Sequence, residues 1–424
     1  GVKGGEIKKL LVLEQLPKPV NFSGGSEPLT IGGTFALERV LGTVPVEPDG
    51  SASMELPAGR PLFFVALDEN DLSVKRMQSF VTVQPGERTS CVGCHEPRRG
   101  TSHAKPGLLA MERPPSPIEP IPDVPGVFDY PRDVQPILDR HCVECHNPDR
   151  RDGGVDLSGD RTPMYTTSYW AMITESLISD GRNYVGNERP RAVGSSASRL
   201  LELADGSHYD AKPSQHERTM LRLWIESGAT YPGTYAGLGC GMSLVAFPAE
   251  TIKRRCGQCH LKANVQPYTG MSQGDQYQFG KLDPPQALVS SFSDFKLVIR
   301  LAYFKFGEAG PHQSLSDLTR PHKSLFLRAP LARGAGGLGL CAGEVFADAT
   351  DPDYVQILAA IGEAAERLEQ QKRFDMPGFR PSPYYVRQMQ HFGVLPRDLS
   401  ADAPIDPYAA DRAYWESFWH RVTE

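Results

Sequence analysis

Three short motifs of the form C-x-x-C-H constrain this chain more than any other feature of its sequence. They are Cys91-Val92-Gly93-Cys94-His95, Cys142-Val143-Glu144-Cys145-His146 and Cys256-Gly257-Gln258-Cys259-His260. The spacing lets two thiols attach to one porphyrin while the adjacent histidine reaches the iron, so each motif is the attachment signature of a c-type haem. A zinc site would need four ligands, usually from paired C-x-x-C runs, and would not require a histidine after every pair. We therefore expect three covalently bound haem c groups, with His95, His146 and His260 as iron ligands.

The remaining composition is compatible with an exported globular protein. The chain has 424 residues, 40% of them hydrophobic, and a net charge of −6, which argues against a nucleic-acid surface or a polybasic membrane patch. No stretch approaches the roughly eighteen apolar residues of a transmembrane helix. Covalent haem attachment takes place outside the bacterial cytoplasm, so we expect a periplasmic or extracellular protein. The chain begins at Gly1 without a methionine or signal peptide, and we therefore expect a processed or incomplete piece of a longer precursor.

Two cysteines lie outside the three motifs, Cys240 and Cys341. An oxidising compartment permits a disulfide between them. The alternative is a pair of unrelated buried thiols.

The pattern of apolar runs and turn residues predicts an α+β protein. Residues 1–111 are predicted to form a β-sandwich that ends in the first haem motif, because short strand-like runs alternate with turn signals. The predicted strands are 7–16, 32–44, 51–56, 62–67 and 80–87. Residues 112–127 contain six prolines and are predicted to be a stiff, extended linker that packs along a neighbouring surface.

Residues 128–238 are predicted to form a mainly helical, cytochrome c-like domain around the second motif. The predicted helices are 131–142, 197–203 and 214–227. His208 lies in the loop between the last two helices, where cytochromes of this layout supply the second axial ligand, and we therefore expect it to bind the second haem. His141 is too close to the motif to reach over the ring, and His216 is expected to be solvated.

Residues 239–424 are predicted to form a second cytochrome c-like domain around the third motif. Its predicted helices are 249–255, 354–371 and 384–392. The second axial ligand of the third haem remains open between His312, His322 and Met376, with a slight preference for His312 because it lies in a loop rich in glycine and proline.

Several strings resemble one protein family. They are VTVQPGERTSCVGCH at 81–95, LVLEQLPKPVNFSG at 11–24, RVLGTVPVEPDG at 39–50, LWIESGATY at 223–231 and FDMPGFRP at 374–381, together with Ser207–Tyr209. Over nearly its whole length the chain resembles the haem-bearing C-terminal half of proteins related to the hydrazine synthase alpha subunit. Members of that family usually carry a β-propeller ahead of this region, so the resemblance implies an upstream domain that is absent here.

The resemblance implies a division of labour between the haems. In the synthase the first haem is catalytic, and the second, bound by two histidines, relays electrons. The resemblance implies that His95 marks the first haem here and that His146 and His208 bind the second. The third motif resembles the additional haem of many relatives. One position differs, because Arg99 stands where the synthase has a tyrosine at its catalytic iron. The chemistry of hydrazine formation is therefore not carried over.

Three functions follow. The leading hypothesis is a triheme cytochrome that passes electrons between redox protein partners. A further hypothesis is a structural subunit of a larger assembly, in which the haems serve as a wire. The alternative is a haem oxidoreductase that acts on a small nitrogen compound at the first haem. The distal side of that haem distinguishes the electron carrier from the oxidoreductase, since His103 or Met111 could cap the iron, whereas an open iron would allow catalysis.

Overall fold

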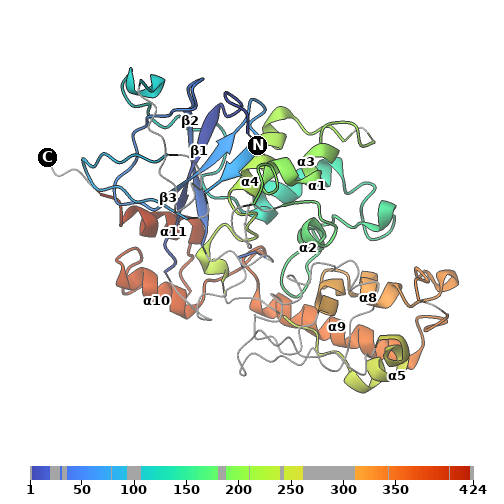
Figure 1. Ribbon diagram of the computed structural model, residues 1–424. Coiled ribbons are helices and arrows are strands. Elements are labelled where there is room, and N and C mark those ends of the chain that lie inside the picture. Colours follow the sequence, from blue (N-terminus) through green and yellow to red (C-terminus); the bar gives the residue numbers. More distant parts are fainter. Residues whose placement is uncertain are drawn as a thin grey trace.

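The computed structural model describes residues 2–19, 29–30, 36–77, 79–92, 107–179, 188–209, 211–238, 243–260, 311–341, 343–400 and 402–420. These residues combine one small antiparallel sheet with many helices (Figure 1). The predicted α+β class is therefore confirmed. No helix among them is both long enough and apolar enough to span a bilayer.

The sheet has four strands in the order β2-β1-β3-β4, and each neighbouring pair is antiparallel. The strands are β1 (Lys9–Gln15), β2 (Glu38–Pro45), β3 (Leu62–Leu67) and β4 (Ser73–Arg76). The predictions for β1 and β3 are confirmed, and β2 occupies the second half of its predicted run. The predicted strand at 51–56 is wrong, because this stretch makes only a single bridge, between Met54 and Ser116.

The predicted β-sandwich is also wrong for the described part of the chain, which contains a single sheet. Helices take the place of a second sheet. Leu13, Phe63 and Val65 from the strands belong to the same buried cluster as Tyr130 and Trp224 from the helical region. Alternating apolar residues indicate that one face of a sheet is buried, but they do not specify whether strands or helices cover it.

The proline-rich segment 112–127 follows the outer edge of the sheet, as predicted for a linker that packs on a neighbour. Thr43 and Glu119 exchange two backbone hydrogen bonds of 2.9 Å, and the Val40 N–H donates to the Gly126 carbonyl at 2.8 Å. Gly42, between these two contacts, has a φ of +143°. The segment thus covers backbone groups of an edge strand that would otherwise be unpaired.

The region around the second motif is helical. Its helices are η2 (Tyr130–Val134), α1 (Gln135–His141), α2 (Thr167–Thr174), α3 (Arg199–Leu203) and α4 (Gln215–Glu226). Helix α4 starts with a capping box, in which the Ser214 hydroxyl and the Glu217 side chain each bind the other residue's backbone N–H. Trp224, on the buried face of α4, packs against Tyr130 with ring centroids 5.2 Å apart. The Tyr130–Trp224 contact thus joins η2, which runs directly into α1, to α4.

Two further cores involve the C-terminal third of the chain. The first includes side chains of α5 (Ala249–His260), α8 (Leu325–Arg328) and α9 (Pro352–Gln371). The other joins α10 (Pro383–His391) and α11 (Pro407–Glu416) to residues near the sheet, where Tyr385 and Trp415 cluster with Leu16 and Leu37. Figure 1 shows α10 and α11 beside the end of the sheet, apart from α5, α8 and α9. Helices α10 and α11 therefore pack against residues from the first part of the chain.

Candidate haem site

The second motif forms a compact turn directly after α1. The backbone N–H groups of Cys145 and His146 both donate to the Cys142 carbonyl, at 3.2 and 2.9 Å. The Asn147 side chain closes the turn by donating to the carbonyls of Val143 and Glu144, at 2.9 and 3.0 Å. These bonds fix the positions from which Cys142, Cys145 and His146 project.

His208 is also held in a turn, between α3 and α4. The Asp205 carboxylate accepts the Ser207 N–H at 2.7 Å, and the Ala211 N–H donates to the His208 carbonyl at 2.9 Å. Tyr209 follows with a φ of +46°, in the left-handed region that a residue with a side chain rarely adopts. The turn brings His208 back toward the motif.

The imidazoles of His146 and His208 lie close together and nearly parallel. Their ring centroids are 5.9 Å apart and their planes differ by 16°. Two histidine nitrogens at about 2 Å on opposite sides of one metal place the ring centroids about 6 Å apart, so the observed separation matches that requirement. An ordinary offset stack of two aromatic rings also spans this distance. A pair of metal ligands is favoured over a simple stack because His146 belongs to a C-x-x-C-H motif.

The ring of His146 is not fully paired within the described protein. Nδ1 of His146 is buried and has no hydrogen-bond partner among the described residues. Buried polar atoms in proteins almost always have a partner, so the protein atoms alone leave this ring incomplete. The residues that would hold a haem attached at Cys142 and Cys145 are the motif histidine His146 and the neighbouring His208. The described residues contain no group of three or more histidine, cysteine, aspartate or glutamate side chains arranged for a bare metal ion.

Glu217 connects the motif to α4. It accepts hydrogen bonds from Arg140 at 2.8 and 3.0 Å and lies 3.2 Å from His141 Nε2. Burial opposes the charge, but the Ser214 N–H and the Arg140 guanidinium outweigh it and lower the pKa of Glu217 to about 2. His141 is therefore engaged away from His146, and His216 is exposed, as the sequence predicts for both.

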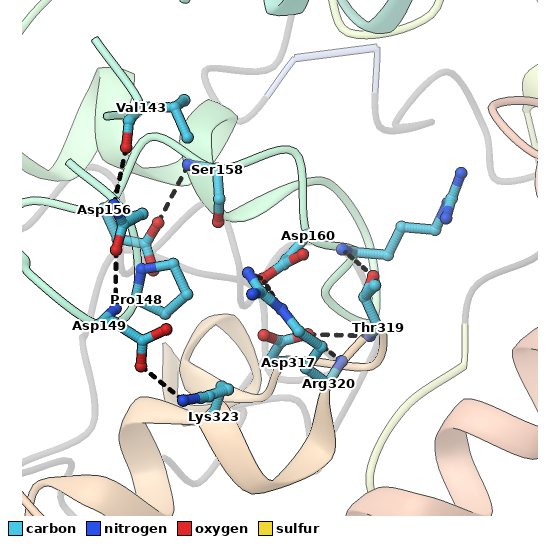
Figure 2. A network of polar contacts seen from close by, with 12 residues as sticks. Val143, Pro148, Asp149, Asp156, Ser158, Asp160, Asp317, Thr319, Arg320 and Lys323 are labelled. Atoms are coloured by element: carbon cyan, nitrogen blue, oxygen red, sulfur yellow. Dashed lines mark hydrogen bonds and ion pairs between the residues drawn. The ribbon is translucent and has the colours of Figure 1, made fainter. Parts of the chain in front are cut away.

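A polar junction fixes the loop after His146 to the segment 311–331 (Figure 2). The Arg320 guanidinium donates to the Asp160 carboxylate at 3.0 Å, and Asp317 accepts the backbone N–H groups of Thr319 and Arg320 at 2.9 and 2.7 Å. Lys323 pairs with Asp149 in the same junction. Burial, and next the charge of Asp160, raise the pKa of Asp317 to about 8. Asp317 is therefore largely protonated at neutral pH.

The first motif is described only at its start. Cys91 is exposed, whereas Cys94, His95, Arg99 and His103 lie outside the described residues. Met111 ends the short helix η1 (Leu109–Met111) and is 74% exposed. An open first haem and a first haem capped by His103 or Met111 therefore both stay predictions.

The third motif lies on the last turns of α5, which continues beyond the predicted end of that helix. Cys256 packs against the neighbouring core. The side chains of Cys259, His260 and His312 lie outside the described residues, as does Cys240, so the third haem and the disulfide with Cys341 stay predictions.

The other two candidate ligands of the third haem are described. His322, in η8 (Pro321–Lys323), is exposed. Met376 packs against the core of α9, and its sulfur accepts the Arg373 N–H at 3.4 Å. These contacts assign Met376 a packing role and leave the choice of ligand open.

The sequence analysis did not predict two contacts. One is the interaction of Glu217 with Arg140 and His141, which we call the Glu217 clamp, and the other is the ring of Tyr209 beside His208. The Ser214-x-x-Glu217 spacing is a capping-box pattern and would have located Glu217 at the start of α4. Nothing in the sequence signals that Arg140 and His141 converge on the same carboxylate.

The described residues thus form an α+β protein in which one of three C-x-x-C-H motifs lies beside a second histidine. Residues 5–96 match the family described as the hydrazine synthase alpha subunit middle domain. The predicted resemblance is confirmed over this segment, which is similar to the middle domain of the hydrazine synthase alpha subunit. A solved structure of hydrazine synthase from Kuenenia stuttgartiensis matches with 20% identity and a TM-score of 0.42, over 55% of this chain and 40% of that one. The match thus spans less than half of that relative's length. No curated protein matches the chain.

Proposed function

We propose that this chain is a triheme c-type redox protein outside the cytoplasm, in which His146 and His208 hold an electron-relaying haem. The observation that carries the proposal is the near-parallel pair of imidazoles, 5.9 Å apart. A haem whose two axial positions are both filled by histidine passes electrons and binds no substrate.

The protein's own part in this function is to fix the two ligands. Hydrogen bonds within the motif turn hold His146, and the turn between α3 and α4 holds His208. Glu217 links the end of α1 to the start of α4 through Arg140 and so limits relative movement of the two ligand-bearing loops. Rigid support of this kind keeps a redox site in one geometry.

The second candidate is an oxidoreductase that acts on a small nitrogen compound at the first haem. The family match favours it over a chain that only passes electrons, since the matched residues 5–96 include Cys91, Cys94 and His95. Arg98 and Arg99 follow the motif, and guanidinium groups bind anionic nitrogen oxides well. In this version His146 and His208 would hold the group that exchanges electrons with the first haem. The two candidates therefore share the relay and differ only at the first haem.

The same proposal includes the finer architecture. Residues 128–238 and 239–424 would each act as a cytochrome c-like unit, with haems at Cys142, Cys145 and at Cys256, Cys259. Redox proteins or other subunits of a larger complex would be the partners. The net charge of −6 favours partners with basic faces.

Carbon monoxide titration of the reduced protein distinguishes the candidates, because carbon monoxide needs an open axial position. Binding at one haem, lost in the variant Cys91→Ala/Cys94→Ala, supports the oxidoreductase. Absence of binding supports the electron carrier. Binding that persists in the double variant places the open site elsewhere and contradicts the assignment of the first haem.

A further inference from the structure

Tyr209 is unusual in two respects. Its side chain is 91% exposed, and its backbone has a φ of +46°. A left-handed backbone is unfavourable for a tyrosine, and an exposed ring makes little compensating packing. Burial of the tyrosine ring therefore does not account for this conformation.

The ring of Tyr209 meets that of His208 edge to face. Their centroids are 4.9 Å apart and their planes are 82° from each other. In an extended backbone, neighbouring side chains point to opposite sides, so adjacent rings do not meet. The left-handed turn at Tyr209 departs from that geometry, and the contact between the two rings accompanies it.

Within the described part of the chain the His208 ring makes no hydrogen bond, and the aromatic rings beside it are those of His146 and Tyr209. A histidine that binds a metal is usually oriented by a second group on the protein. Among the described side chains, Tyr209 lies where such an orienting group would contact the His208 ring.

We infer that Tyr209 is a positioning residue that sets the plane of the His208 imidazole, so that it lies nearly parallel to His146. The inference rests on the proposed function, because it assumes that both histidines bind the second haem. The aromatic edge carries the effect, since the ring, not the hydroxyl, is what makes the contact with His208. The relative orientation of two axial imidazoles determines the electron paramagnetic resonance signal of a ferric haem, which gives a readout independent of activity.

The test compares the variants Tyr209→Ala and Tyr209→Phe with the parent protein, all as full-length chains. We expect Tyr209→Ala to shift the low-spin signal and the midpoint potential of one haem and to let reduced protein bind additional carbon monoxide. Tyr209→Phe should retain the parent signal because the aromatic edge remains. Tyr384→Ala is the matched control, since Tyr384 is also exposed, at 59%, but lies on α10. It should change none of these properties.

Two results would overturn the inference. One is a parent-like signal in Tyr209→Ala, and the other is a Tyr209→Phe signal that matches Tyr209→Ala. His208→Ala, measured in parallel, separates this inference from the proposed function. If His208→Ala leaves every haem unaltered, the ligand assignment itself fails. If it converts one haem to high spin while Tyr209→Ala changes nothing, only the role of Tyr209 fails.

Discussion

At the scale of single residues, Gly42 decides whether the proline-rich segment can lie against the sheet. A Cβ atom at this position would lie 2.1 Å from the Glu119 carbonyl oxygen, and the φ of +143° is strained for any other residue. We expect Gly42→Ala to lower the free energy of unfolding by more than about 1 kcal/mol. Urea denaturation measures the change.

Gly362 is the matched control for that substitution. It lies in α9, where a Cβ atom would meet no other part of the chain within 4 Å, and its φ is not positive. Alanine favours helix over glycine by about 1 kcal/mol, so Gly362→Ala should raise stability. Equal effects of the two substitutions would contradict the close approach at Gly42.

Among the elements, the junction between the loop after His146 and the segment 311–331 should respond to pH. Folding raises the pKa of Asp317 from 3.8 to about 8, so the folded protein binds more protons than the unfolded chain between these values. The free energy of unfolding therefore falls as pH rises through this range, by at most about 1.4 kcal/mol per pH unit.

Asp317→Asn should flatten that dependence, because the amide imitates the protonated acid and still accepts the two backbone N–H groups. Thermal unfolding of the parent and the variant tests this between roughly pH 4 and pH 8, which are the pKa values of Asp317 in the unfolded and the folded protein. Asp149→Asn, at the exposed end of the same junction, should keep the parent slope. An unchanged slope in Asp317→Asn would show that another group carries the proton.

The elements also show which predictions the sequence can support. Strand β3 and helix α4 follow local patterns, an apolar run between turns and a capped amphipathic helix, so both are predicted correctly. The four-residue strand β4 is too short to give a pattern. Helices α2 and α11 are not predicted either, since α2 is apolar on nearly every side and α11 has a weak periodicity.

At the scale of the whole molecule, the sequence proposes His208 as a ligand but does not predict the residues that surround it. The position of His208 in a loop before α4 is enough to propose it as a ligand, because that loop returns to the motif in cytochromes of this layout. The clamp from Glu217 to Arg140 spans 77 residues, and no local pattern encodes it. The packing of α10 and α11 beside the sheet likewise depends on contacts between distant parts of the chain, such as the hydrogen bond from the Trp415 indole N–H to the Pro17 carbonyl at 3.3 Å.

The central claim is that His146 and His208 hold one haem between them. The most direct test is the absorption and electron paramagnetic resonance spectrum of His208→Ala, with His216→Ala as the control, since His216 is a nearby exposed histidine. The account predicts that His208→Ala converts one haem from low to high spin and leaves the others unaltered, while His216→Ala matches the parent. A parent-like spectrum of His208→Ala would contradict it.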